Sequence, residues 1–160
     1  MDRTRALGEE LVRVHGWLRT ELARLRDEID DHAGGDAAWL IPLGAHCAAF
    51  CLALAQHHGS EDSVAFPALA ERYPELAPVL EELRRDHALV ADILRRLREL
   101  LDTLAPDNAD RVRGELDGLA AILESHFQWE ERRLTAALDA LDTEQTTEEL
   151  LGAEPPTREP

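Results

Sequence analysis

The sequence predicts an all-α protein, an antiparallel up-down-up-down four-helix bundle with a disordered acidic C-terminal tail. Four long stretches space their apolar residues by alternating three and four positions, which is the pattern of a helix that buries one face. Hydrophobic residues make up 44% of the chain and aromatic residues only 4%, so the apolar content is mostly Leu, Ala and Val. No segment shows the alternation with period two that indicates a half-buried strand.

The first two helices are predicted on either side of a glycine pair. The first extends from about residue 4 to 31, and Gly34 and Gly35 follow it as stop signals. The second extends from about residue 36 to 72. It is expected to kink or break near Pro67, because proline cannot donate the helical hydrogen bond.

The last two helices are predicted on either side of the sequence APDNAD. The third begins within YPELAP and extends to about residue 104, with Pro78 acceptable in its first turn. The fourth extends from about residue 108 to 141. Connections this short favour an antiparallel arrangement of neighbouring helices.

The C-terminal part of the sequence differs in composition. Residues 1–142 are predicted to form the bundle, and residues 143–160 a flexible acidic, Pro-rich tail. Such a composition buries too little apolar area to compensate for the entropy of ordering. The exception that we expect is one short helical turn at residues 148–151.

The net charge of −16 excludes several classes of partner. Nucleic acids and anionic membrane surfaces repel such a chain. No apolar run is expected to reach the length of a membrane span. The sequence MDRTRALGEELV lacks the apolar region of a secretory signal, so a cytoplasmic protein is expected.

Each of the four apolar helix faces carries one histidine, and two of these are followed four residues later by a glutamate. The six polar residues are His15, His57, Glu61, His87, His126 and Glu130. Counting residues to the helix ends at about 1.5 Å per residue puts all four histidines in one layer of an up-down bundle. No arginine lies on these faces, and the chain has no lysine. A bound cation would offset the cost of burying two carboxylates.

Six ligands of this kind suit two metal ions, each held by about two histidines and bridged by the two carboxylates. Structural zinc prefers four tetrahedral ligands, often cysteine, and calcium and magnesium prefer oxygen alone. Mixed imidazole and carboxylate ligands favour iron or manganese.

These motifs resemble those of the hemerythrin HHE cation-binding family over about residues 10–140. The matching stretches are His15, HHGSED with His57 and Glu61, DH with His87, HFQWEE with His126 and Glu130, and the FPAL that follows Val64 and Ala65. The resemblance implies two iron ions in a non-haem di-iron centre bridged by the glutamates and an oxo or hydroxo group. It also implies reaction with dioxygen, peroxide or nitric oxide, and manganese is the alternative metal.

One departure from the family pattern bears on function. Oxygen-carrying hemerythrins have a second histidine on the third helix, four residues from the first, where this chain has Leu83 and Ala91. The site is therefore expected to be one imidazole short of the carrier pattern. Open metal positions favour reaction over reversible binding. Glu131 is the alternative to Glu130 as ligand.

Other functions stay open at this point. The chain could be a di-iron oxygenase acting on an organic substrate, an iron storage or buffering protein, or a bundle with a purely structural polar layer. A sensor would need a redox or signalling protein partner. The sequence alone does not choose between carrier, sensor and enzyme, and it does not fix the oligomeric state.

Several polar residues near the predicted ligands are given weaker roles. His46 is predicted to be a core or interface histidine, or part of a second polar site with Cys47 and Cys51, which read as small buried residues. His58 points about 100° away from His57 and is expected at the surface or beside the ligands without binding metal.

Asp62 and Asp86 each adjoin a predicted ligand in the sequence. Either could accept a hydrogen bond from a ligand imidazole, as metal sites commonly require. A solvated helix face is nevertheless the favoured interpretation for both.

Overall fold

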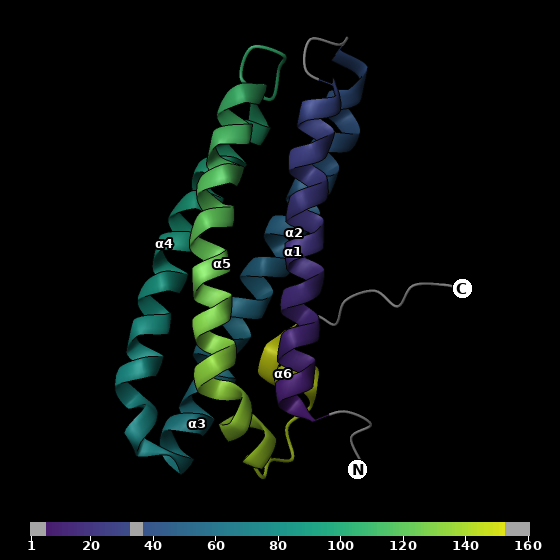
Figure 1. Ribbon diagram of the computed structural model, residues 1–160. Coiled ribbons are helices and arrows are strands. Elements are labelled where there is room, and N and C mark those ends of the chain that lie inside the picture. Colours follow the sequence, from purple (N-terminus) through teal and green to yellow (C-terminus); the bar gives the residue numbers. More distant parts are fainter. Residues whose placement is uncertain (1–5, 33–36, 153–160) are drawn as a thin grey trace, which may run out of the picture.

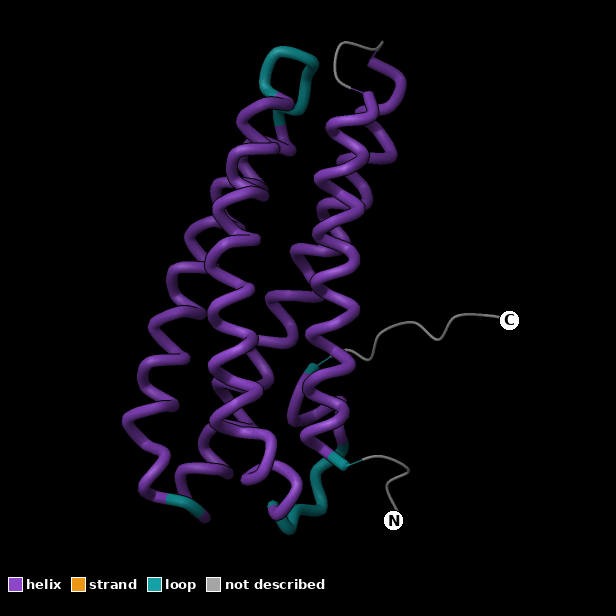
Figure 2. Tube along the Cα trace, viewed as in Figure 1, coloured by secondary structure: helices purple, strands orange, loops and turns teal. Residues whose placement is uncertain are grey.

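A computed structural model describes residues 6–32 and 37–152 of the chain. Every regular element in these two ranges is helical and none is a strand, which confirms the all-α prediction (Figure 2). The four longest helices are α1 (Leu7–His32), α2 (Leu40–Ser60), α4 (Ala77–Asp102) and α5 (Ala109–Ala140). Neighbouring long helices run in opposite directions (Figure 1), and α5 packs most extensively against α1 and α4.

The short elements explain most differences from the predicted boundaries. One turn of 3-10 helix (Ala37–Trp39) leads into α2, and another (Pro74–Leu76) leads into α4, whose first turn contains Pro78. The predicted start of the first helix and the Gly34–Gly35 pair lie outside the described residues.

The second helical segment continues through Pro67 instead of breaking there. Between α2 and α3 (Phe66–Arg72) the chain forms a π-helix, η2 (Glu61–Ala65), in which the amide of Phe66 donates to the carbonyl of Glu61. A proline ring clashes with the carbonyl four residues earlier, and a wider turn accommodates it. Such π-helical turns often occur at functional sites, and this one begins at Glu61.

The apolar core consists of two clusters, one on each side of the polar layer. On α1, Leu11 belongs to one cluster, and Val14 and Leu18 belong to the other. On α5 the same division falls between Phe127 and Leu134. His15 on α1 lies between Leu11 and Leu18, and Glu130 on α5 lies between Phe127 and Leu134, so both have one apolar cluster on each side.

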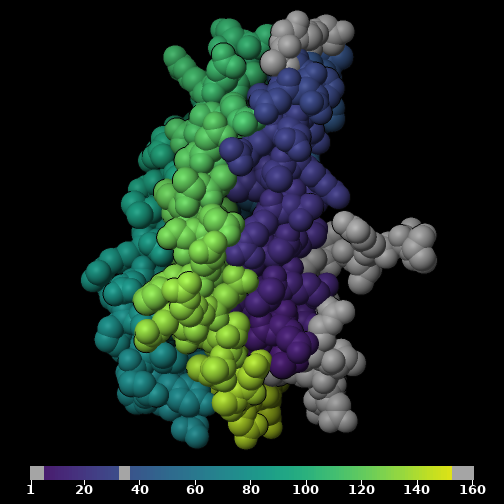
Figure 3. All heavy atoms as spheres, viewed as in Figure 1, coloured from purple at the N-terminus to yellow at the C-terminus, as the bar shows by residue number. Residues whose placement is uncertain are grey.

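The C-terminal tail is the main correction to the predicted fold. Residues 142–152, which we call the C-terminal strap, contain a short helix, α6 (Thr147–Leu151), that packs against α1, α2 and η2 (Figure 1). Figure 3 shows the yellow-green end of the chain at the base of the bundle, beside the purple start of α1. Leu150 and Leu151 are fully buried in the same apolar cluster as Leu11. The helical turn expected at residues 148–151 is confirmed as α6. The prediction of a flexible tail is otherwise wrong up to residue 152, because two leucines fill the end of the bundle; residues 153–160 lie outside the described part.

The segment Ala37–Arg72 also corrects an expectation. It is the one described helical stretch that is long and apolar enough, by length and composition, to cross a membrane. No charged residue occurs from Leu40 to Ser60, and Ile41 and Leu52 are exposed. The inward side of the same stretch buries His57 and Glu61, as expected of a core helix.

Candidate metal centre

Seven polar side chains meet in the layer between the two apolar clusters. They come from α1 (His15), α2 (His57 and His58), the first residue of η2 (Glu61), α4 (His87) and α5 (His126 and Glu130), and we call them the His/Glu cluster. The most exposed of them, His58, is 6% exposed. The four predicted histidines therefore lie in one layer, with ring centres 5.2 Å apart for His15 and His57 and 4.9 Å apart for His87 and His126.

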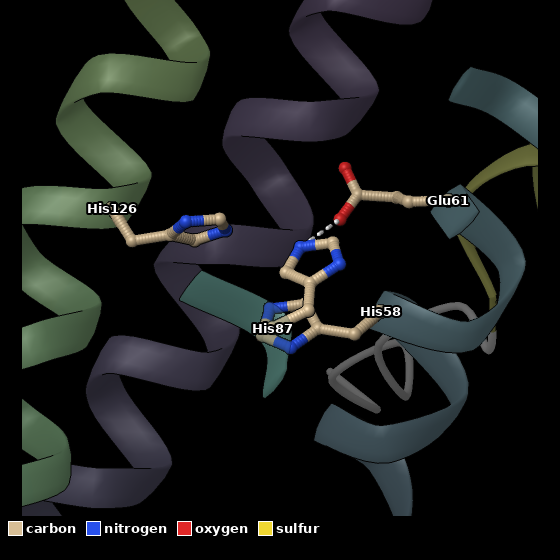
Figure 4. Close-up of side chains that lie close together, drawn as sticks. All are labelled: His58, Glu61, His87 and His126. Atoms are coloured by element: carbon tan, nitrogen blue, oxygen red, sulfur yellow. Dashed lines mark ion pairs between the residues drawn. The ribbon is translucent and has the colours of Figure 1, made fainter. Parts of the chain in front are cut away.

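The cluster divides into two overlapping groups whose ligand atoms lie within 4.8 Å of one another. His15, His57, Glu61 and Glu130 form the first group. His58, Glu61, His87 and His126 form the second, and Figure 4 shows these four side chains converging from α2, η2, α4 and α5. Glu61 belongs to both groups, so its carboxylate lies close to histidines of each.

Each carboxylate connects histidines of the two groups. Oε1 of Glu61 lies 3.4 Å from Nε2 of His57 and 3.4 Å from Nε2 of His87. Oε1 of Glu130 lies 3.4 Å from Nε2 of His15, and its Oε2 lies 3.1 Å from Nε2 of His126. Glu61 on η2 and Glu130 on α5 thus each lie between a histidine of the first group and a histidine of the second.

Three histidines use their other ring nitrogen to contact an acceptor outside the cluster. Nδ1 of His87 lies 2.8 Å from Asp62, and Nδ1 of His126 lies 2.9 Å from Asp86. Nδ1 of His57 lies 2.6 Å from the main-chain carbonyl of Leu151. Because these oxygens only accept, each Nδ1 carries the proton and each Nε2 turns a lone pair toward the cluster. Asp62 and Asp86 therefore accept hydrogen bonds from candidate ligands, which was the less favoured interpretation, and both are also partly exposed to solvent.

Glu131 lies beside the cluster rather than in it. Its carboxylate accepts a hydrogen bond of 3.0 Å from Arg19 and lies 3.7 Å from Nδ1 of His15. Glu130 is completely buried and faces the histidines. Of the two alternatives on α5, the structure places Glu130 among the candidate ligands.

The atoms that face the centre of the cluster have no hydrogen-bond partner among the described residues. They are the Nε2 atoms of all five histidines and three carboxylate oxygens of Glu61 and Glu130. Lone pairs of nitrogen and oxygen at 3.1–3.4 Å repel one another unless a proton or a cation lies between them. Imidazole nitrogens and carboxylate oxygens together suit a divalent transition metal.

Burial sets the protonation of the metal-free cluster. It lowers the pKa of His57 to about 3, and burial and the neighbouring His87 lower that of His58 well below the usual value. Both rings are therefore neutral at pH 7, which is the form that binds metal.

The two carboxyl groups respond in opposite directions. Burial and the neighbouring Glu130 raise the pKa of Glu61 well above its usual value. Burial would also raise the pKa of Glu130, but the neighbouring Glu61, His126 and His15 outweigh it and lower that pKa well below its usual value. Without a cation, the pair therefore holds one proton.

His58 is the candidate ligand that sequence reasoning missed. It stacks on His87 with ring centres 3.8 Å apart, and its unpartnered Nε2 points into the second group. The cluster contains five imidazoles, one more than the four that the sequence predicted. The missed signal is the width of the buried face of α2, because Cys51 and His58 are buried beside the predicted stripe that contains Leu54 and His57 and ends at Glu61.

Of the two roles predicted for His46, that of an interface histidine is confirmed, and the second polar site with Cys47 and Cys51 does not form. His46 instead lies at the α1–α2 boundary, where its ring nitrogens are 2.7 Å from Glu21 and 3.0 Å from Glu28. Cys47 and Cys51 are free cysteines buried in the core, as the favoured interpretation held.

Comparison with protein families supports the same assignment. A family model for the hemerythrin HHE cation binding domain matches residues 7–150, which include the whole His/Glu cluster and most of the C-terminal strap. Comparison with curated proteins gave no match. Comparison with solved structures also gave none.

Proposed function

Since the chain belongs to the hemerythrin HHE cation-binding domain family, we propose that its His/Glu cluster holds a non-haem di-iron centre that binds or reacts with dioxygen, peroxide or nitric oxide. Manganese is the alternative metal, because it accepts the same mixture of imidazole and carboxylate ligands. Enzymatic consumption of peroxide, or oxygenation of an organic substrate, belongs to the same range of chemistry.

A single observation carries this proposal: eight buried nitrogen and oxygen atoms converge with no hydrogen-bond partner. His15 and His57 would hold one ion, and His58, His87 and His126 the other. Glu61 and Glu130 would bridge the two, since each lies near a histidine of both groups. When bound, the two metals would supply redox chemistry and sites for small ligands; a bridging oxo or hydroxo group follows from the family resemblance.

The chain's own residues prepare the site in three ways. The apolar clusters on both sides of the polar layer exclude water. Asp62 and Asp86 hold the Nδ1 protons of His87 and His126 and so fix which nitrogen is free to bind metal. Because these aspartates are 39% and 36% exposed, they also connect the buried rings to solvent.

We also propose a cytoplasmic location. The free Cys47 and Cys51 support it, because thiols stay reduced in that compartment. Dioxygen, peroxide and nitric oxide are small and neutral, so the net charge of −16 does not hinder their approach.

Metal analysis and an optical spectrum of the purified protein test the proposal. We expect about two iron ions per chain and near-ultraviolet absorption of an oxo-bridged pair that bleaches on anaerobic reduction. Rapid return of the absorption with consumption of peroxide would favour an enzyme, and return on exposure to air without net consumption would favour a carrier or sensor. Failure to bind iron or manganese after anaerobic reconstitution, with unchanged helicity, would contradict the proposal.

A further inference from the structure

The C-terminal strap makes a direct contact with the His/Glu cluster. The carbonyl oxygen of Leu151 lies 2.6 Å from Nδ1 of His57, a residue 94 positions earlier in the chain. The side chain of His57 is fully buried, so this contact has no competition from water. For His87 and His126 the corresponding acceptors come from residues on the four long helices and η2. His57 instead depends on a segment outside them.

Gly152 allows the strap to come this close. Its φ is +88°, in the region that favours glycine. A Cβ atom placed there would lie 2.8 Å from Cα of His57 and 2.9 Å from the carbonyl oxygen of Gln56. Both neighbours are main-chain atoms of a helix that cannot move aside, so any larger residue would lift the strap from α2.

The rest of the strap is held firmly enough to present that carbonyl. Thr146 and Glu149 form a capping box, in which the amide of Glu149 donates to the hydroxyl of Thr146. Leu150 and Leu151 are 0% and 1% exposed. The two buried leucines thus anchor the strap in the bundle, and the carbonyl of Leu151 points at the ring of His57.

We propose that the C-terminal strap is a positioning element for His57: docking of the strap fixes the Nδ1–H tautomer and the orientation of this ring, and so completes one half of the metal centre. The effect on metal binding rests on the proposed function, whereas the effect on the ring does not. A carbonyl can only accept, so Nδ1 carries the proton and the free Nε2 is the nitrogen that lies near His15, Glu61 and Glu130.

The first test uses metal-free protein and Gly152→Ala, with Gly59→Ala as the matched control. Gly59 lies two residues from His57, and a Cβ there would meet nothing within 4 Å. In nitrogen-15 NMR at neutral pH we expect the wild type and Gly59→Ala to show a slowly exchanging Nδ1–H proton on His57. In Gly152→Ala this signal should be lost or should exchange quickly, while helicity is unchanged. An unaltered signal in Gly152→Ala would overturn the proposal.

The second test measures metal affinity by competition with a chelator, using iron(II) under anaerobic conditions. Removal of a hydrogen bond to a ligand histidine commonly costs about 10–100-fold in affinity. We expect a loss of this size in Gly152→Ala for one of the two ions, and none in Gly59→Ala. Equal affinities in the two variants, with the NMR signal lost, would also overturn the positioning role.

A milder variant covers the case in which Gly152→Ala fails to fold. Thr146→Ala removes the cap of α6 and leaves Gly152 in place, so it should produce a smaller change of the same NMR signal. The two proposals can fail separately. If the wild type binds no iron but Gly152→Ala still loses the His57 signal, the di-iron function is contradicted and the positioning of the ring by the strap is retained.

Discussion

At the scale of single residues, the adjacent pair His57 and His58 shows how one helix serves both halves of the centre. Consecutive residues on a helix differ in direction by about 100°. The helix α2 contacts both α1 and α4. His57 therefore faces the group with His15, and His58 faces the group with His87 and His126.

Substitution of His58 tests its new assignment. We expect His58→Ala to weaken binding of one metal ion at least tenfold, because it removes one of three imidazoles from the second group. Metal stoichiometry at increasing chelator concentration measures this. His32→Ala is the control, since His32 is exposed and stacks on Trp39 outside the cluster. If both variants retain metal as the wild type does, His58 is not a ligand.

Substitution of Glu61 is expected to have the largest effect of any single change. Glu61 is shared by the two groups, so Glu61→Ala removes a candidate ligand from both ions. We expect less than half of the wild-type metal content after reconstitution, determined by elemental analysis. Glu71→Ala, an exposed glutamate on α3, is the control. Two ions per chain in Glu61→Ala at wild-type affinity would rule out the bridging position.

At the scale of elements, α1 and α2 are joined by His46, which contacts Glu21 and Glu28. Partial burial opposes protonation of His46, but hydrogen bonds with the two glutamates outweigh it and raise its pKa above the usual value. Proton binding is thus stronger in the folded state. The resulting stabilisation is fully present below about pH 6.5 and is lost as the pH rises through the folded-state pKa.

This pH dependence is measurable in metal-free protein. We expect the free energy of unfolding of the wild type to exceed that of His46→Gln by roughly 0.2–1 kcal/mol near pH 5.5, as for other partly exposed ion pairs. The difference should shrink toward zero near pH 8.5, about two units above the usual pKa of histidine. Urea unfolding at several pH values gives both curves. A difference that grows with pH would contradict the assigned direction.

At this scale the sequence predicted some features of the fold and the site and missed others. Spacing of apolar residues predicted the four long helices and the layer of His15, His57, His87 and His126. It missed His58, since a narrow stripe understates the buried width of α2. It also missed the packing of the strap, because Leu150 and Leu151 are buried in a gap that exists only once the helices are assembled. The π-helical turn likewise reflects an accommodation to Pro67 that periodicity does not contain.

At the scale of the whole molecule, the polar layer divides the core and weakens it. Two clusters of apolar residues are separated by seven polar side chains, whose inward atoms lack hydrogen bonds. Each unpartnered buried group costs about 1–3 kcal/mol relative to one that is paired. A metal that binds only the folded state offsets this cost, so the proposed function predicts that stability depends on metal.

Removal of metal is therefore expected to lower the thermal midpoint. An ion at about 100 times its Kd stabilises the folded state by about 2.7 kcal/mol. For a chain of this size, each kcal/mol shifts the midpoint by about 2–4 °C, so each ion should contribute about 5–10 °C. Calorimetry of the iron-loaded protein before and after chelation measures the shift, and addition of iron(II) should restore it.

The variant Glu61→Ala separates a metal effect from an effect of the chelator itself. It lacks the shared carboxylate, so its midpoint should respond to chelation and to added iron by less than half as much as that of the wild type. In the absence of metal, it should also lose little stability relative to metal-free wild type, since it removes a buried carboxyl whose Oε1 has no partner while leaving a small cavity. A wild-type midpoint that ignores chelation, together with full helicity, would mean that the seven side chains form a structural layer and not a metal centre.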